Sequence, residues 1–82
     1  MKAHVVVTLK SGVLDPQGRA ISRSLSSLGF TEVGDVRLGK YLEIELTGSS
    51  RAELAARVEE MCQKLLANPV TEQFRYEIRE ET

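Results

Sequence analysis

Residues 51–66 read RAELAARVEEMCQKLL and carry the clearest helical pattern of the chain. Apolar side chains recur at helical spacing and form one stripe, which consists of Leu54, Ala55, Val58, Met61, Cys62, Leu65 and Leu66. Asn68-Pro69 ends this helix, because the residue before a proline is disfavoured in the helical region. The stripe predicts that the helix packs on a sheet, with Cys62 buried as a small apolar side chain.

Strand patterns lie on both sides of this helix. Before it, residues 33–46 alternate between apolar and polar side chains, and Gly39-Lys40 between the two runs suits a two-residue hairpin turn. After it, Val70, Phe74, Tyr76 and Ile78 alternate with polar neighbours as a last strand. Near the N-terminus, residues 4–9 alternate in the same way and predict the first strand.

A second helix is predicted between the first strand and the hairpin. Asp15-Pro16 opens it, since an aspartate caps free backbone N–H groups and a proline suits the first helical position. Ile21, Leu25 and Leu28 follow at helical spacing, and Gly29 ends the helix. Serines at positions 22, 24, 26 and 27 lower its helix propensity, so this helix depends on tertiary packing.

The order β-α-β-β-α-β predicts an α+β fold of the ferredoxin-like kind, an antiparallel four-stranded sheet with both helices on one face. With 82 residues the chain is expected to make one domain, residues 1–82, with a thin core. Self-association is a natural way for such a chain to bury more area. The fold class hosts many unrelated functions and decides none of them.

Composition argues against several classes of protein. The 11 basic and 12 acidic residues are interspersed, which predicts no nucleic-acid surface. Cys62 is the only cysteine, which favours a reducing cytoplasm, and no stretch approaches the roughly 20 apolar residues of a membrane helix. With a single histidine, His4, and no phosphate-binding loop, we expect no metal, no bound cofactor and no catalysis by this chain alone.

The packing of a core does not by itself explain three segments of the sequence. They are GVLDPQG at 12–18, VRLGK at 36–40 and LLANPV at 65–70. Gly18 falls in the first helical turn at a cost of about 1 kcal/mol relative to alanine. It indicates either a tight capped turn or close approach by a partner. Arg37 and Lys40 at the hairpin tip either protect an exposed strand edge or dock on a partner. The third segment is a plain helix stop if taken singly.

Together and in this order, the segments resemble the PurS family, the small subunit of the multi-subunit phosphoribosylformylglycinamidine (FGAM) synthase. The resemblance covers LKSGVLDPQG at 9–18, LGF at 28–30, VRLGK at 36–40 and, from Met61-Cys62 onward, LLANPV at 65–70. It implies a homodimer or tetramer that joins a synthetase subunit, PurL, and a glutaminase subunit, PurQ, in de novo purine biosynthesis. In that family the assembled complex uses ATP, Mg and glutamine to convert formylglycinamide ribonucleotide (FGAR) into FGAM, and the catalytic groups belong to the partners.

The resemblance therefore implies a bridging role, in which ammonia released from glutamine reaches the synthetase without escaping. The residues predicted to contact partners are Asp15, Gln17, Gly18, Arg37, Lys40 and Asn68. A different class stays open at this point, a dimeric ferredoxin-like regulatory module that binds a small metabolite.

Overall fold

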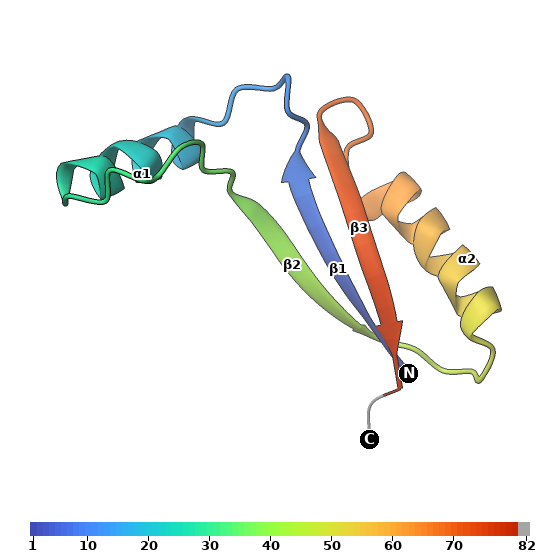
Figure 1. Cartoon of the computed structure of the whole chain (residues 1–82). Coiled ribbons are helices and arrows are strands. Elements are labelled where there is room, and N and C mark those ends of the chain that lie inside the picture. The colour runs from blue at the N-terminus through green and yellow to red at the C-terminus, as the bar shows by residue number, and fades with distance from the viewer. Residues whose placement is uncertain (81–82) are drawn as a thin grey trace.

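One antiparallel sheet of three strands organises the chain (Figure 1). The computed structural model describes residues 1–80. The strands are β1 (Lys2–Leu9), β2 (Gly39–Glu45) and β3 (Glu72–Arg79), and β1 lies in the middle of the order β2-β1-β3. The helical segments are α1 (Pro16–Ser27), α2 (Arg51–Met61) and η1, a π-helix that continues α2 over Cys62–Leu66. The predicted α+β class is confirmed.

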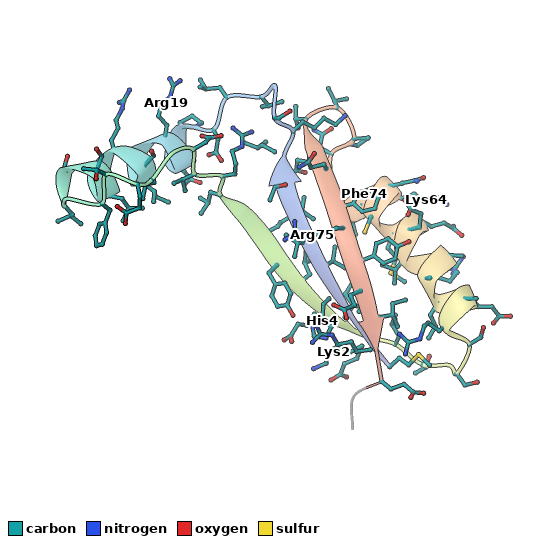
Figure 2. The ribbon with its side chains drawn as sticks, viewed as in Figure 1. Lys2, His4, Arg19, Lys64, Phe74 and Arg75 are labelled. Atoms are coloured by element: carbon teal, nitrogen blue, oxygen red, sulfur yellow. The ribbon has the colours of Figure 1, made fainter. Side chains whose placement is uncertain are left out.

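The core lies between α2 and one face of the sheet. The register pairs Val5 with Leu42 of β2 and with Tyr76 of β3, so these side chains share a face. Val58 of α2 and Cys62 of η1 pack against that face, and both are fully buried. Figure 2 shows the same alternation in β3, where Phe74 points toward α2 and Arg75 points to the opposite face. The prediction that the helix of residues 51–66 packs on a sheet through Cys62 is confirmed.

The ends of α1 follow local capping rules. The Asp15 side chain accepts a hydrogen bond from the Gly18 backbone N–H, and Pro16 occupies the first helical position. At the other end Gly29 adopts a φ of 99°. The Phe30 N–H bonds to the Leu25 carbonyl, which satisfies a carbonyl at the helix end. The predicted start and stop of this helix are confirmed.

The predicted four-stranded sheet with both helices on one face is wrong for this chain. Residues 33–38 form no strand, and Gly39 and Lys40 begin β2 instead of turning a hairpin. The polar groups of residues 33–38 are used along α1 instead: the Gly34 carbonyl accepts from the Ser22 hydroxyl, and the Leu38 N–H bonds to Asp15. As a result α1 extends away from the end of the sheet, and only α2 covers it (Figure 1).

The helix of residues 51–66 also differs from the prediction near its end. The Ala67 N–H bonds to the Cys62 carbonyl five residues earlier at 3.0 Å, which is π-helical spacing. The wider turn carries Leu65 out of the apolar stripe, and Leu65 is 81% exposed. The prediction that Leu65 shares the stripe with Cys62 is wrong, because periodicity alone does not reveal a change of helix type.

Candidate partner-binding site

The three unexplained segments of the sequence meet at one end of the sheet, where β1 ends. The Lys10 N–H bonds to the Thr71 carbonyl at 2.8 Å, and the Lys10 Nζ donates to the Pro69 carbonyl at 2.7 Å. The Arg37 guanidinium donates to the Lys10 carbonyl at 2.7 Å. Residue 10 thus joins segment 36–40 to segment 65–70, while segment 12–18 follows directly along the chain.

Asp15 holds the two sides of the α1 arm together, where the α1 arm denotes residues 10–38. One carboxylate oxygen accepts from the Gly18 N–H at 2.9 Å, and the other accepts from the Leu38 N–H at 2.8 Å. These two backbone hydrogen bonds lower the pKa of Asp15 below its usual value, and the nearby Arg37 cation lowers it further. Asp15 is buried, and its hydrogen bonds stabilise the arm root, the place where residues 10–18 and 36–38 leave the sheet.

Arg37 has a similar internal role. Its guanidinium donates to the carbonyls of Lys10 and Val13 at 2.7 and 2.9 Å, and to the Leu9 carbonyl at 3.4 Å. One terminal nitrogen of the guanidinium, Nη2, makes all three contacts, and its positive charge strengthens its hydrogen bonds to these carbonyls. Arg37 therefore closes the connector between β1 and α1, instead of standing at the tip of a hairpin.

Gly18 is required by a contact within the chain. A Cβ atom at this position would lie 2.1 Å from the Val36 carbonyl oxygen, which is a backbone atom of the returning segment. The sequence left two interpretations of Gly18, a tight capped turn and close approach by a partner. The structure shows the capped turn, and the backbone that lies close to Gly18 belongs to the same chain. Gly18 thus sets how closely α1 and residues 33–38 run together.

Asn68 builds the turn between η1 and β3. Its side-chain oxygen accepts from the Val70 N–H at 3.0 Å, and its backbone N–H donates to the Glu72 carboxylate at 2.6 Å. The Glu72 N–H returns a bond to the Asn68 carbonyl at 2.7 Å. An asparagine suits this position because its short side chain can bond the backbone two residues ahead.

Gln17 and Lys40 differ from the other predicted contact residues. Both are exposed, and within residues 1–80 neither side chain forms a hydrogen bond or ion pair. Both line a hollow of about 270 Å³ at the arm root, with Asp15, Leu38 and Glu72 among its other walls. The structure therefore brings Asp15, Gln17 and Lys40 together, and it leaves the last two available to a protein surface. That any of the six residues contacts a partner stays a prediction.

Apolar side chains at the surface were not predicted as contact residues. On the α1 arm, Leu28 is 73% exposed, and Ile21 and Phe30 are also exposed. At the end of η1, Leu65 and Val70 are exposed as well. With both helices predicted on one face of the sheet, Ile21 and Leu28 were expected to be covered there. The serine-rich sequence of α1 indicated that this helix depends on tertiary packing.

The surroundings of Cys62 disfavour its thiolate form. Burial raises the pKa of the Cys62 thiol, and the nearby Glu59 raises it further, so this thiol is a poor nucleophile. No group of three or more histidine, cysteine, aspartate or glutamate side chains within residues 1–80 is placed to hold a metal ion. No helix in this part of the chain is long and apolar enough to cross a membrane.

Comparison with known proteins identifies the family. The sequence matches the family described as PurS: Phosphoribosylformylglycinamidine (FGAM) synthase, over residues 2–80. The chain belongs to the PurS family. The phosphoribosylformylglycinamidine synthase subunit PurS of Bacillus subtilis (strain 168) is 52% identical over 79 residues, which is 96% of this chain and 93% of the relative. The resemblance drawn from the three segments is confirmed.

Two solved PurS structures share the fold. The chain is similar to Methanocaldococcus jannaschii PurS, one of the subunits of formylglycinamide ribonucleotide amidotransferase, with a TM-score of 0.84 and 41% identity. That comparison covers 99% of this chain and 98% of the other. A chain in the structure of PurLQS from Thermotoga maritima also gives a TM-score of 0.84, with 32% identity and 93% of each chain covered. PurS chains with this fold therefore occur in a complex named for PurL, PurQ and PurS.

Proposed function

We propose that this chain is the small, non-catalytic subunit of FGAM synthase and that it bridges a glutaminase subunit, PurQ, and a synthetase subunit, PurL. The observation that carries the proposal is the family match over residues 2–80. The similarity to a chain of the PurLQS structure from Thermotoga maritima supports it. The complex would use ATP, Mg and glutamine to convert FGAR into FGAM in the cytoplasm, with the catalytic groups on its partners.

The bridging mechanism is one of proximity. A subunit that holds an ammonia source beside an ammonia consumer replaces a bimolecular encounter with a local transfer. The surface of the chain suits such a task, since the hollow at the arm root offers the exposed groups of Gln17 and Lys40 beside the exposed Leu38. We place partner contacts there, and we expect the bridge to act as a homo-oligomer.

The test compares two nitrogen donors. Purified PurL and PurQ are assayed for FGAM formation with glutamine and, separately, with ammonium ions, each with and without this chain. We expect glutamine-dependent formation to require the chain and ammonia-dependent formation to proceed with PurL alone. Glutamine-dependent turnover that is unchanged by omission of the chain would refute the bridging role.

The other class considered, a regulatory module that binds a small metabolite, is not favoured. The family match extends over nearly the whole chain, so no separate segment remains for a different activity. A thermal shift that saturates with one metabolite in the absence of both partners is the result that would revive it.

A further inference from the structure

The sheet has a second face, which no helix of residues 1–80 covers (Figure 1). This open face is formed by Lys2, His4, Val6 and Thr8 of β1 and by the residues of β2 and β3 that pair with them. It lies opposite α2, because successive residues of a strand point to opposite faces and the α2 side holds the buried Val5. Charged side chains of both edge strands belong to the open face, and an apolar layer would bury them without partners. A polar protein surface therefore suits it better.

A hollow of about 330 Å³ lies on the open face. Its middle is a row of three residues, since the register pairs Val6 with Tyr41 on one side and with Arg75 on the other. Neighbouring strands lie about 4.8 Å apart, so the backbones of Tyr41 and Arg75 are separated by about 10 Å. The hollow thus has an apolar floor at Val6, an aromatic wall and a cationic wall.

The aromatic wall is held in place although Tyr41 is 57% exposed. Its ring stacks on the His4 ring, with the two centroids 5.9 Å apart. Its hydroxyl shares a hydrogen bond with the His4 Nδ1 and lies 3.5 Å from a carboxylate oxygen of Glu43. A side chain that is already fixed loses little conformational entropy on binding. Tyrosine and arginine are also among the residues that most often dominate the energy of a protein interface.

The unmatched charge in the hollow is positive. Glu77 accepts a hydrogen bond from Arg79 at 2.9 Å, and this bond lowers the pKa of Glu77, so these two charges balance each other. Arg75 is exposed, and within residues 1–80 its side chain forms no hydrogen bond or ion pair. A guanidinium binds a carboxylate through two parallel hydrogen bonds. The group that fits the hollow is therefore a carboxylate next to an apolar side chain.

The position of the hollow meets a requirement of bridging. A subunit that holds two partners at the same time needs two surfaces that do not overlap. The hollow at the arm root and the hollow on the open face share no lining residue. Lys40 and Tyr41, which line one hollow each, are successive residues of β2, so their side chains leave the sheet on opposite faces.

We propose that the open face is a second partner-binding surface of this chain and that it receives an acidic loop of one partner subunit. A carboxylate of the loop pairs with Arg75, and a neighbouring apolar side chain packs on Tyr41 and Val6. The other partner binds at the arm root, where Gln17 and Lys40 are exposed. The inference rests on the proposed function, because it specifies where the second of the two bridged partners binds.

The first experiment measures the association of the fluorescently labelled chain with PurL and PurQ by sedimentation, in the presence of glutamine. Arg75→Glu should raise the dissociation constant by about tenfold or more, because it sets one carboxylate against another. The matched control is Arg57→Glu, which makes the same charge reversal at an exposed arginine of α2 and should change the constant less than about twofold. Equal constants for the two variants would overturn the proposal.

Two further measurements guard this test. Tyr41→Ala should also weaken the association, and urea midpoints show whether either open-face variant has lost its fold. The isolated Arg75→Glu chain should keep the sedimentation mass of the isolated parent. A lower mass would assign the open face to contacts between copies of this chain and would overturn the proposal.

The second experiment locates the two partners. A photo-cross-linker is attached at Gln73→Cys, which is two residues from Arg75 on the same face, or at Gln17→Cys at the arm root. The parent, whose single Cys62 is buried, gives the background. We expect the two positions to label different subunits, and the peptide labelled from residue 73 to contain aspartate or glutamate. Labelling of one subunit from both positions, or of a further copy of this chain from residue 73, would overturn the proposal. The glutamine assay of the parent chain would still decide the bridging role separately.

Discussion

Both helices of this chain carry an apolar stripe, yet they are held in different ways. The α2 helix is fixed by burial: Val58 and the adjoining Cys62 lie against the sheet without solvent exposure. The α1 helix is fixed at its root by polar contacts, through Asp15 and Arg37, and by the close approach of Gly18 to Val36. Apolar burial stabilises one helix within the chain, whereas hydrogen bonds aim the other away from it and leave its stripe for another surface.

The largest expected effect on the free energy of unfolding comes from a change in the core beneath α2. Val58→Ala should lower the free energy of unfolding by about 2–3 kcal/mol, because it removes methyl groups from a closely packed core and leaves a cavity. Urea denaturation at several protein concentrations measures it. Leu28→Ala on the α1 arm should instead cost stability mainly at concentrations where the chain is assembled. Equal losses for both variants at every concentration would contradict the distinction between the helices.

A smaller effect is expected at the arm root. Gly18→Ala places a Cβ within 2.1 Å of the Val36 carbonyl oxygen, a backbone atom that must move, and should cost about 1–2 kcal/mol. Gly12→Ala is the matched control, since an added Cβ there has no neighbour within 4 Å among the residues described. Its effect should be neutral or slightly stabilising. Urea midpoints and the rate of proteolysis within residues 10–38 report both changes, and equal behaviour of the two variants would refute the role of Gly18.

The stabilising contribution of the Asp15 carboxylate at the arm root should also depend on pH. The folded-state pKa of Asp15 lies below its unfolded value of about 3.9. Its stabilising contribution is therefore complete above the unfolded pKa and is lost as the pH falls through the folded pKa. Asp15→Asn should be less stable than the parent at neutral pH, and this difference should shrink below about pH 4. Thermal midpoints across the acid range test it, with Asp35→Asn, an exposed carboxylate on the same arm, as the control. A gap that does not change with pH would contradict the role assigned to the Asp15 carboxylate.

The smallest effect on stability is expected at the exposed contact residues. Gln17→Ala with Lys40→Ala should change the free energy of unfolding by less than about 0.5 kcal/mol. The same pair should weaken association with PurL and PurQ by several-fold, on the order of 1 kcal/mol. Lys64→Ala serves as the control, because Lys64 is an exposed cation of η1, outside the α1 arm, that pairs only with Glu60 among the described residues. Unchanged association, measured by titration calorimetry, would remove Gln17 and Lys40 from the contact surface.

Much of the local structure could be predicted from the sequence. Asp15-Pro16 and Gly29 marked both ends of α1, and alternation located β1 and the greater part of β2 and β3. These signals act over a few residues and hold where distant neighbours agree with them. Over residues 33–38 the same alternation predicted a strand, but the segment bonds to α1 instead. The candidate site was predicted in part: six residues were named, and the structure shows that Asp15, Gly18, Arg37 and Asn68 are used within the chain. Whether a polar side chain turns inward depends on which carbonyl or N–H group lies beside it, and the sequence does not reveal that.

What the sequence by itself determined is the type and limits of most elements, the family, and the need of α1 for packing. Only the tertiary structure decided where that packing could come from. An apolar stripe indicates that a helix must be covered. It does not specify the covering surface, because the hydrophobic effect is non-directional. The direction comes from the Arg37 and Asp15 hydrogen bonds and from the contact at Gly18, which together send α1 away from its own sheet.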